Sequence, residues 1–546
     1  MPKGIHTVKF CSSIFFCLHT KKIKKEGYKE TTVSSLISVL LILNLKDMKK
    51  IGLLSSALLL SGVLSTMNAD VIYVKENASG DGMSWSSPAS LEDALTWAAK
   101  GDEIFVAKGT YTGSFSLKVA ATVYGNCEGT ETSAPTYTTA EGLETFLKGP
   151  GDKRVMLLDG GASIYGFDIS GGDATLETTG VGRGGGVYVN SGGGAIKYCR
   201  IHDNMAVDGS KQATEDNGRI PLRGVGGGAY VWNGRIENCI IENNVATTSP
   251  WKKTDNNVWS MGVGGGLCLE ANEGAEADVV AMNCIIRNNS TTPNDDENSY
   301  PCQGGGIAIK SGYLVNSLVV GNRVNGSNNN QSIGGGIACT QKQAYVINCT
   351  AYDNHVMGLG GGIAFQSQNA DGMRAVVSNC IAWNNTCRDD DYGAGLNNIR
   401  MGNAQTDGKL PERVTINVVC VPESTVASGA IISDPKFVDA AAGDFRLAEG
   451  SPCIDAGDDP AVEGYDVDLA GNPRIAGAAV DLGPYEYTGG SAIDEVEAYE
   501  GEVVRTQYYT LQGVEVTYPS VSGLYIVKKT LDTNQVITEK QFITIR

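Results

Sequence analysis

A few short clusters hold the side chains of this chain that could move protons or stabilise charge. Arg200, His202 and Asp203 lie within one short apolar run, and Arg287 has a comparable place further along the chain. A carboxylate beside an imidazole can transfer protons, and a guanidinium can stabilise developing negative charge, as a polysaccharide lyase requires. A glycoside hydrolase would instead need two carboxylates facing one cleft. We expect His202 to be an exposed residue at a strand end rather than a general base.

Acidic clusters offer a second kind of chemistry, because carboxylate oxygens are the ligands that calcium prefers. They lie at residues 295–297, at residues 389–391 and at Asp455, Asp458, Asp466 and Asp468. We interpret the second cluster as a solvated turn and the third as structural. With four His and no Cys-x-x-Cys spacing, zinc is not expected. The sequence therefore predicts no catalytic residue, no metal site and no cofactor, and calcium binding has no support.

A repeat must position these side chains. Six glycine triplets begin at Gly184, Gly226, Gly264, Gly304, Gly334 and Gly360, and each precedes an apolar run that ends in Asn. Apolar residues alternate at period two inside each unit, which indicates strands. A repeat of 26 to 42 residues with two short strands predicts a parallel β-helix, because stacked coils bury a face that one unit cannot bury alone. A propeller and a leucine-rich solenoid fit the spacing less well.

Stacking of this kind places equivalent residues above one another. The expected interior column contains Cys199, Cys239, Cys284, Ser317, Cys349 and Cys380, and the expected corner column contains Asn204, Asn244, Asn289, Asn322, Asn354 and Asn385. Amides in such a column can bond to each other and to the turn backbone. The chain has 14 cysteines, and we expect most of them to be free buried thiols, since small apolar side chains suit the interior.

The net charge and the N-terminal leader indicate where in or outside the cell the protein is expected. The formal charge is −18, and residues 70–546 alone carry 33 − 58 = −25, which disfavours nucleic acid and anionic lipid as partners. Residues 48–69 read as a signal peptide, with two lysines before an apolar stretch. Residues 1–47 read as a misassigned start or a disordered leader. We expect a secreted protein at the outer-membrane surface or outside the cell, with no transmembrane span in the mature chain.

Two terminal phrases and the repeats resemble known families. The opening at residues 73–113 and the phrase DPKFVDAAAGDFRLAEGSPCIDAGD at residues 434–458 resemble secreted bacterial right-handed parallel β-helix proteins of the pectin-lyase-like superfamily. The glycine-triplet and Asn-Cys repeats resemble those of polymorphic outer-membrane proteins, which are adhesins. The resemblance implies an N-terminal cap with the first coils at residues 70–125, including a helix near residues 91–99 capped by Ser90, and a solenoid over residues 126–488.

The tail reads as a separate small unit. A linker at residues 489–493 precedes residues 494–546, whose TLQGVEV and GLYIV phrases resemble the C-terminal sorting domain of type IX secretion. That resemblance implies a small β-sandwich that engages the outer-membrane secretion machinery. The expected fold class is therefore all-β, a right-handed parallel β-helix followed by a C-terminal β-sandwich.

Four insertions between the corner Asn and the next glycine triplet suggest a binding side. They cover residues 205–225, 245–263, 290–303 and 323–333, and inserts at equivalent positions leave a solenoid on one side. The candidate ligand-binding residues there are Trp251, Trp259, Tyr300, Lys252 and Arg223. Aromatic rings beside polar groups suit contact with sugar or protein. The alternative is that these rings fold back onto the coil wall.

The function expected from this pattern is adhesin-like binding of an extracellular glycan or of a host or bacterial surface protein. The fold class also includes polysaccharide lyases and glycoside hydrolases, so an enzyme of that kind is the alternative. A purely structural surface protein is the second alternative. Nothing in the sequence identifies a ligand.

Overall fold

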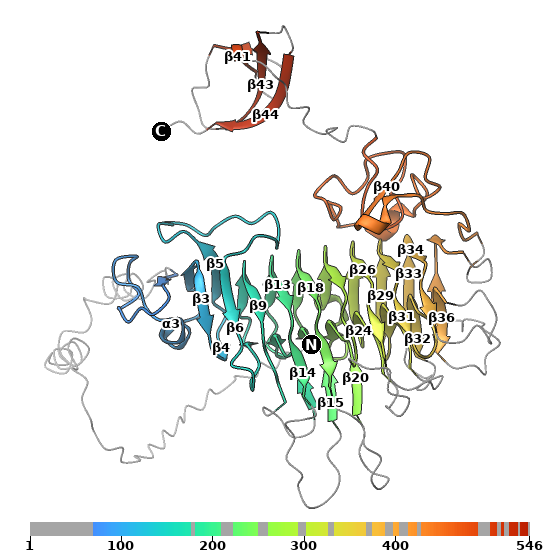
Figure 1. Ribbon diagram of the computed structural model, residues 1–546, viewed down its shortest axis with the longest axis horizontal. Coiled ribbons are helices and arrows are strands. Elements are labelled where there is room, and N and C mark those ends of the chain that lie inside the picture. The colour runs from blue at the N-terminus through green and yellow to red at the C-terminus, as the bar shows by residue number, and fades with distance from the viewer. Residues whose placement is uncertain are drawn as a thin grey trace, which may run out of the picture. The chain divides into compact units, whose positions relative to one another are not determined.

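The fold was analysed in a computed structural model, which describes residues 69–175, 181–208, 222–248, 260–292, 302–325, 332–366, 374–387, 397–402, 413–422, 427, 429–489, 503–509, 515–517, 523–532 and 536–543. Residues 1–68 lie outside the described residues. The described chain is almost entirely β-structured (Figure 1). Within the described residues, no helix has the length and apolar character needed to cross a lipid bilayer.

Three long parallel sheets form the body of the fold. Sheet A has 11 strands: β1 (Val71–Val74), β2 (Glu103–Ala107), β5 (Thr122–Cys127), β8 (Ser163–Tyr165), β12 (Ala195–Lys197), β17 (Arg235–Glu237), β22 (Val280–Met282), β25 (Gly312–Val315), β29 (Gln343–Ile347), β33 (Arg374–Ser378) and β37 (Val414–Ile416). Sheet B has ten: β3 (Gly109–Thr112), β6 (Thr145–Lys148), β9 (Asp168–Ser170), β13 (Arg200–His202), β18 (Ile240–Glu242), β23 (Ile285–Arg287), β26 (Leu318–Val320), β30 (Thr350–Tyr352), β34 (Cys380–Trp383) and β38 (Val419–Cys420). Sheet C has nine: β4 (Phe115–Leu117), β7 (Met156–Leu158), β11 (Val187–Val189), β16 (Ala229–Trp232), β21 (Leu267–Glu270), β24 (Ile307–Ile309), β28 (Ile337–Cys339), β32 (Ile363–Gln366) and β36 (Ile399–Gly402).

The chain visits the sheets in the order C, A, B in every coil, for example β16, β17 and β18, and then pairs with the same three strands of the next coil. Parallel strands joined by crossovers of this kind wind in the right-handed sense. The predicted right-handed parallel β-helix is therefore confirmed. Between sheets B and C run short parallel ladders: β14 (Met205–Val207) with β19 (Val245–Thr247), β10 (Val181–Arg183) with β15 (Leu222–Val225) and β20 (Ser260–Val263), and β27 (Arg323–Val324) with β31 (His355–Val356) and β35 (Thr386–Cys387).

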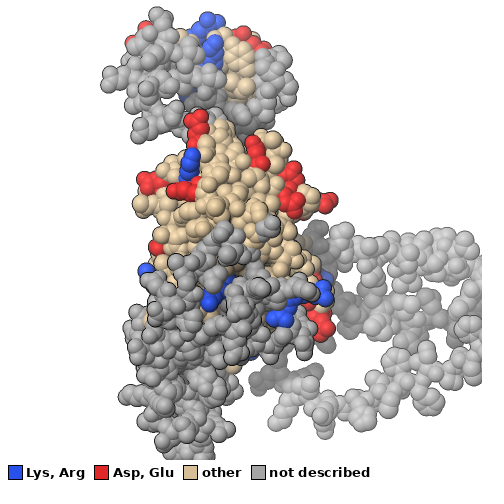
Figure 2. Space-filling view, turned by 90° about the vertical axis from the view of Figure 1, so that its right-hand side faces the viewer, with Lys and Arg blue, Asp and Glu red and all other residues tan. Residues whose placement is uncertain are grey.

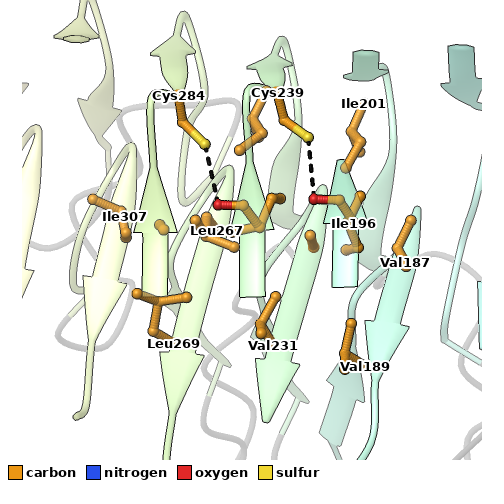
Figure 3. Close-up of a cluster of buried hydrophobic side chains, with 14 of the residues drawn as sticks. Val187, Val189, Ile196, Ile201, Val231, Cys239, Leu267, Leu269, Cys284 and Ile307 are labelled. Carbon is orange, nitrogen blue, oxygen red and sulfur yellow. Dashed lines mark hydrogen bonds between the residues drawn. The ribbon is translucent and has the colours of Figure 1, made fainter. Parts of the chain in front are cut away.

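The interior is a continuous apolar core because one face of every strand points inward. Equivalent residues of successive coils face each other in register, as Ile201, Ile241 and Ile286 do in sheet B. The cysteine column predicted from the repeat is confirmed: Cys199, Cys239, Cys284, Cys349 and Cys380 are all 0–1% exposed, and Ser317 fills the gap. Their thiols donate to backbone carbonyls, as Cys239 does to Ile196 O of the preceding coil at 3.6 Å (Figure 3). All twelve described cysteines are free.

The corner before each sheet C strand explains why glycine triplets and asparagines recur together. In one coil, Gly226 has φ +65°, a Cβ on Gly227 would lie 2.2 Å from Gly265 O, and a Cβ on Gly228 would lie 2.7 Å from Asn244 Nδ2. The first glycine thus supplies a left-handed turn, which glycine adopts without steric cost. The third leaves room for the amide of the corner asparagine. The glycine triplet and the corner asparagine of a coil therefore recur together because they pack against each other.

The corner asparagines form the predicted ladder. From the second member onward, each Oδ1 accepts from the backbone N–H and the Nδ2 of the asparagine in the preceding coil, and each Nδ2 also donates to a backbone carbonyl of that coil. The Oδ1 of the first member, Asn204, accepts from Gly172 N at 2.9 Å instead. Asn289, for example, receives both bonds from Asn244 at 3.0 Å and donates to Ile241 O at 2.9 Å. The six predicted members are 0–3% exposed, and Asn398 adds a seventh rung. Buried amides satisfied in this way tie each coil to the next.

The ends of the chain add smaller elements. Helix α3 (Leu91–Trp97) covers the first coils and is capped as predicted, with Ser90 Oγ accepting from Asp93 N at 3.1 Å. Three short 3₁₀ turns are η2 (Glu276–Asp278), η5 (Ala440–Ala442) and η6 (Asp459–Val462). The tail contains an antiparallel sheet in the order β42 (Glu515–Val516), β41 (Val503–Tyr509), β43 (Gly523–Leu531) and β44 (Val536–Ile543), consistent with the expected small β-unit.

Residues 434–487, which we call the terminal segment, differ from the irregular final coils expected there. They add no strand to the three parallel sheets and contain only the antiparallel pair β39 (Phe437–Asp439) and β40 (Asp444–Leu447). The segment instead lies against the turn between sheets A and B in the last coils. Asn316 Nδ2 donates to Val467 O at 2.9 Å, and Asn348 Nδ2 donates to Asp481 O at 2.9 Å.

A single substitution tests how much the asparagine ladder contributes to the stability of the fold. Replacing Asn289 with Ala leaves the backbone N–H of Asn244 and one of its two Nδ2–H groups without an acceptor and removes the amide donor to Ile241 O, so we expect a loss of about 3 kcal/mol in the free energy of unfolding. The neighbouring Asn243 is exposed with φ +54°, and Asn243→Gly is the control, with a change below about 0.5 kcal/mol. Urea unfolding measures both. Equal losses in the two variants would contradict the ladder's role.

Candidate functional site

One of the five predicted binding residues lies among the described residues. Arg223 is in β15, half-buried, and its buried Nε has no hydrogen-bond partner there. Trp251, Trp259, Tyr300 and Lys252 lie outside the described residues, as do the acidic clusters at 295–297 and 389–391. The flanks of the first two insertions stack in register, with Met205 paired to Val245 and Leu222 paired to Ser260. These two insertions therefore leave the coils at equivalent places.

The structure does bring together the other charged residues that the sequence singled out. Arg200 and His202 lie on the outer face of β13, Asp203 follows them at the corner, and Arg287 ends β23 two coils further on. Two carboxylates that the sequence did not single out join them, Asp168 on β9 and Glu242 on β18. Each lies in a coil adjacent to Arg200, so parallel pairing of sheet B is what assembles the group.

Glu242 is shared by two arginines. Its Oε1 lies 2.6 Å from Arg200 Nη2, and its Oε2 lies 2.6 Å from Arg287 Nε. The Glu242 side chain is 5% exposed, whereas the two guanidinium side chains are 39% and 41% exposed. The carboxylate thus lies beneath the surface, and the cations extend above it.

Sheet A repeats this construction on the other side of the turn. Glu237 at the end of β17 is 8% exposed and is shared by Lys197 Nζ at 2.8 Å and Arg235 Nε at 2.5 Å. Lys197 and Arg235 are 27% and 43% exposed. We call Lys197, Arg200, Arg235 and Arg287 the basic face. It runs across the A/B turn of successive coils.

Electrostatics hold the basic face in its charged form. Burial raises the pKa of Glu237 and of Glu242, but the hydrogen bonds from their paired cations outweigh it, so both pKa values are lowered. Burial lowers the pKa of Lys197 and of Arg200, but bonds to the same carboxylates outweigh it, and both pKa values are raised. Both buried carboxylates are therefore ionised at neutral pH. The cations are the more exposed members of these pairs, and Asp203, whose side chain is 64% exposed, adds negative charge at the edge of the face.

His202 lies between two carboxylates at the edge of this face. Its Nε2 is 2.8 Å from Asp168 Oδ1 and its Nδ1 is 2.7 Å from Asp203 Oδ2. The bond to Asp168 raises the pKa of His202, burial opposes this, and the bond to Asp203 adds to the increase. The residue does end a strand as predicted, but its side chain is 15% exposed, so the expected full exposure is wrong. The raised pKa favours the imidazolium, which cannot accept a proton.

Aromatic rings lie on the N-terminal side of the basic face. Tyr137, from the loop after β5, stacks on Tyr198 with ring centroids 5.7 Å apart. Lys197 Nζ lies 5.8 Å from the centroid of the Tyr165 ring. All three rings are half-buried. They add flat apolar surface beside the cations.

The terminal segment bounds the face on its C-terminal side. Arg474 Nη1 donates to Asn316 Oδ1 at 3.0 Å, and Asp458 N donates to Asn379 Oδ1 at 2.8 Å, so the A/B turns of these coils are covered. Tyr465 packs beside Tyr313 and Tyr345, whose rings stack at 4.2 Å. The coils that carry the basic face come before this covered stretch. In Figure 2, which faces the end where the terminal segment lies, acidic side chains line both margins of a largely uncharged surface.

Two of the four aspartates that the sequence singled out in the terminal segment bond to its own backbone. Asp468 Oδ1 accepts from Asn472 N at 2.7 Å, and Asp455 Oδ1 accepts from Ala478 N at 2.6 Å. Among the residues that the structure describes, no three His, Cys, Asp or Glu side chains are grouped to hold a metal ion. The basic face presents cations paired to buried carboxylates, with His202, whose pKa is raised, at its edge.

Comparisons with known proteins give fold relatives alone. No protein-family model and no curated protein matches the chain. A pectate lyase, Pel9A, matches with 14% identity over 76% of this chain and 96% of its own, at a TM-score of 0.38. The tailspike gp49 of Acinetobacter baumannii bacteriophage Fri1, a capsular polysaccharide depolymerase, matches with 11% identity over 88% of this chain and 79% of its own, at 0.23. At these TM-scores neither likeness bears on function, and the fold rests on the strand pairing.

The two carboxylates beside His202 should contribute unequally to its pKa. Asp168 is the larger cause of the increase, so Asp168→Asn should lower the pKa of His202 more than Asp203→Asn does. Asn also suits the positive φ of 51° at position 203. An NMR titration of the imidazole Cε1 proton measures all three proteins. If Asp203→Asn lowered the pKa of His202 more than Asp168→Asn did, the described placement of His202 between the two carboxylates would be wrong.

Proposed function

We propose that this protein is an extracellular glycan-binding β-helix, and that its basic face takes an acidic polysaccharide. The observation that carries the proposal is the pair of shared carboxylates: Glu237 and Glu242 are buried, and each supports two cations that extend to solvent. An ion pair made only for stability needs one cation per carboxylate. Two partly exposed cations on one buried acid leave positive charge to meet a ligand.

Carboxylate and sulfate groups are the ligands that such a face recognises. Arg200, Arg235 and Arg287 each offer planar N–H donors, and guanidinium–carboxylate bonds are among the stronger hydrogen bonds in proteins. Because the rest of the chain is strongly acidic, a basic face is a local exception that would attract an anionic polymer to one place. Weak repulsion between the anionic polymer and the acidic remainder of the protein would favour a single orientation of the bound polymer.

The coil geometry suits a linear polymer. Cations on successive coils are spaced by the strand separation of about 4.8 Å. The half-buried rings of Tyr137, Tyr165 and Tyr198 at one end offer apolar faces against which sugar rings can pack. A chain lying along the solenoid axis would meet the aromatic rings first and then the four cations.

The location follows from the two ends of the sequence. The signal peptide at residues 48–69 would direct the chain out of the cytoplasm, and residues 494–546 would engage the type IX secretion machinery for delivery to the outer-membrane surface. The proposal includes the adhesin-like role, with a surface protein as the other candidate partner. It also keeps as candidate ligand contacts the insertion residues Trp251, Trp259, Tyr300 and Lys252. Arg223 is the one predicted binding residue that lies among the described residues.

Cleavage of the polysaccharide is the second candidate. The specific observation that favours it is His202, whose imidazolium beside Arg200 could give a proton to a leaving oxygen. Against it, the buried carboxylates Asp168, Glu237 and Glu242 are all paired to cations, and the exposed Asp203 is bonded to His202 itself.

Two substitutions test binding without exposing a buried charge. In Arg235→Gln, Glu237 keeps Lys197, and in Arg287→Gln, Glu242 keeps Arg200. We expect each to weaken binding to an acidic polysaccharide about tenfold, measured by affinity electrophoresis or a glycan array, with little effect on unfolding. Arg446→Gln is the matched control, because Arg446 is exposed and paired to Asp444 in the terminal segment. Binding that is unchanged in both variants would disprove the assignment.

Product analysis separates the two candidate functions. A binder releases neither reducing ends nor unsaturated sugars from the polysaccharide that it retains. If products did appear, and His202→Gln abolished them while binding persisted, the protein would be an enzyme. Binding that falls with added salt is expected in either case, since the contacts are ionic.

A further inference from the structure

Two cysteines outside the interior column meet where the terminal segment covers the last coil. Cys420 is on the outer face of β38, paired with Ile381, and Cys453 belongs to the terminal segment. Both are 0% exposed and share one apolar cluster with Ile381, Leu447 and Leu482. Cys420 Sγ donates to Ser433 O at 3.4 Å, and the Cys453 thiol is a second hydrogen-bonding neighbour of Cys420. Each backbone is held in place by its own partner, since Cys420 bridges to Ile431 and Leu482 N donates to Cys453 O at 3.0 Å.

The column cysteines have a geometry that disfavours crosslinking. Equivalent residues of stacked parallel strands lie about 4.8 Å apart with parallel Cα–Cβ bonds, so their Cβ atoms are also about 4.8 Å apart. A disulfide needs Cβ atoms about 3.5 to 4.5 Å apart and side chains that converge. Cys199, Cys239 and Cys284 donate to backbone carbonyls, as Cys420 also does, so it is the stacking in register that separates the column from the Cys420–Cys453 pair. Cys420 and Cys453 come from segments that are not stacked in register, so this restriction does not apply to them.

We propose that Cys420 and Cys453 form a disulfide in the exported protein, which fastens the terminal segment to the last coil. Each thiol loses a proton and an electron as the S–S bond forms. The two electrons and two protons reduce the disulfide of a thiol–disulfide oxidoreductase, or glutathione disulfide, to two thiols. Because both sulfurs are buried in the folded chain, the bond forms while the terminal segment docks. This inference does not depend on what the basic face binds.

The crosslink would hold the terminal segment against the last coil. The backbone edge of β38, the last strand of sheet B, is bonded to a residue just before that segment: Ile431 N donates to Val419 O at 2.9 Å, and Val421 N donates to Ile431 O at 2.9 Å. The terminal segment covers the outer side of this strand with Leu447, Cys453 and Leu482. The same segment bounds the basic face, so the bond would also hold that boundary in place.

Peptide mapping of the full chain tests the inference. The protein is unfolded in urea, refolded with oxidised and reduced glutathione, alkylated without reduction and digested. A second sample is taken from protein secreted through an oxidising compartment, so that the result does not depend on refolding. We expect a crosslinked peptide containing Cys420 and Cys453 that disappears on reduction, and no crosslink between Cys199 and Cys239. Alkylated Cys420 and Cys453 in both samples, or column crosslinks formed as readily, would overturn the proposal.

Thermal unfolding provides a second readout. Oxidised wild type should unfold about 5 °C above the reduced protein, because the crosslink restricts the unfolded chain. Cys453→Ser should lose this redox difference, and Cys239→Ser, a column variant, should keep it. A redox difference that survives in Cys453→Ser would assign it to another pair and contradict the inference.

Discussion

The hydrogen-bonded ladder of corner asparagines is the constraint on which the rest of this structure depends. Each amide satisfies a backbone N–H and a carbonyl of the neighbouring coil while it is itself buried, so a coil cannot slip without leaving several polar groups unsatisfied. The glycine triplet exists to make room for this amide, as the contacts of Gly228 with Asn244 show. Register is therefore set at one corner, and the cysteine column and the apolar core follow from it.

Fixed register is also what builds the basic face. Glu242 can bond to Arg200 and Arg287 because the three lie on adjacent strands of sheet B, separated by one coil each. Glu237 takes Lys197 from the neighbouring strand of sheet A in the same way. A slip of one residue would turn these side chains to the other face of the sheet. The basic face, as the proposed binding surface, is thus a consequence of the stacking of coils in register.

The sequence predicted the elements that repeat and missed those that do not. The glycine triplets, the asparagine corner and the cysteine column could be read directly, because each is a local motif with a period. The partners of Arg200 could not, since Asp168 lies in a coil before the first full repeat. A signal for Glu242 was present: His202, Glu242 and Arg287 occupy one repeat position with charges that alternate. Comparing that position between repeats would have predicted the pair of Glu242 with Arg287, but not the pair with Arg200, which lies two residues before the compared position.

The terminal segment shows a second limit of the sequence. Its phrases predict the end of a β-helix, but its contacts with Asn316, Asn348 and Asn379 join residues more than 70 positions apart. These asparagines precede the column cysteines, or the serine that replaces one, and have positive φ. Their amides serve a segment that no periodicity connects to them. Long-range docking of this kind follows from shape and hydrogen bonding, which a repeat pattern does not contain.

An experimental structure of the protein soaked with an acidic oligosaccharide would test the central claim most directly. The account predicts density for a sugar chain along the solenoid axis, with its acidic groups within hydrogen-bond distance of Arg200, Arg235 or Arg287. Density on another side of the coils, or none at concentrations where binding is measured in solution, would contradict the claim that register-matched charge pairs form the recognition surface.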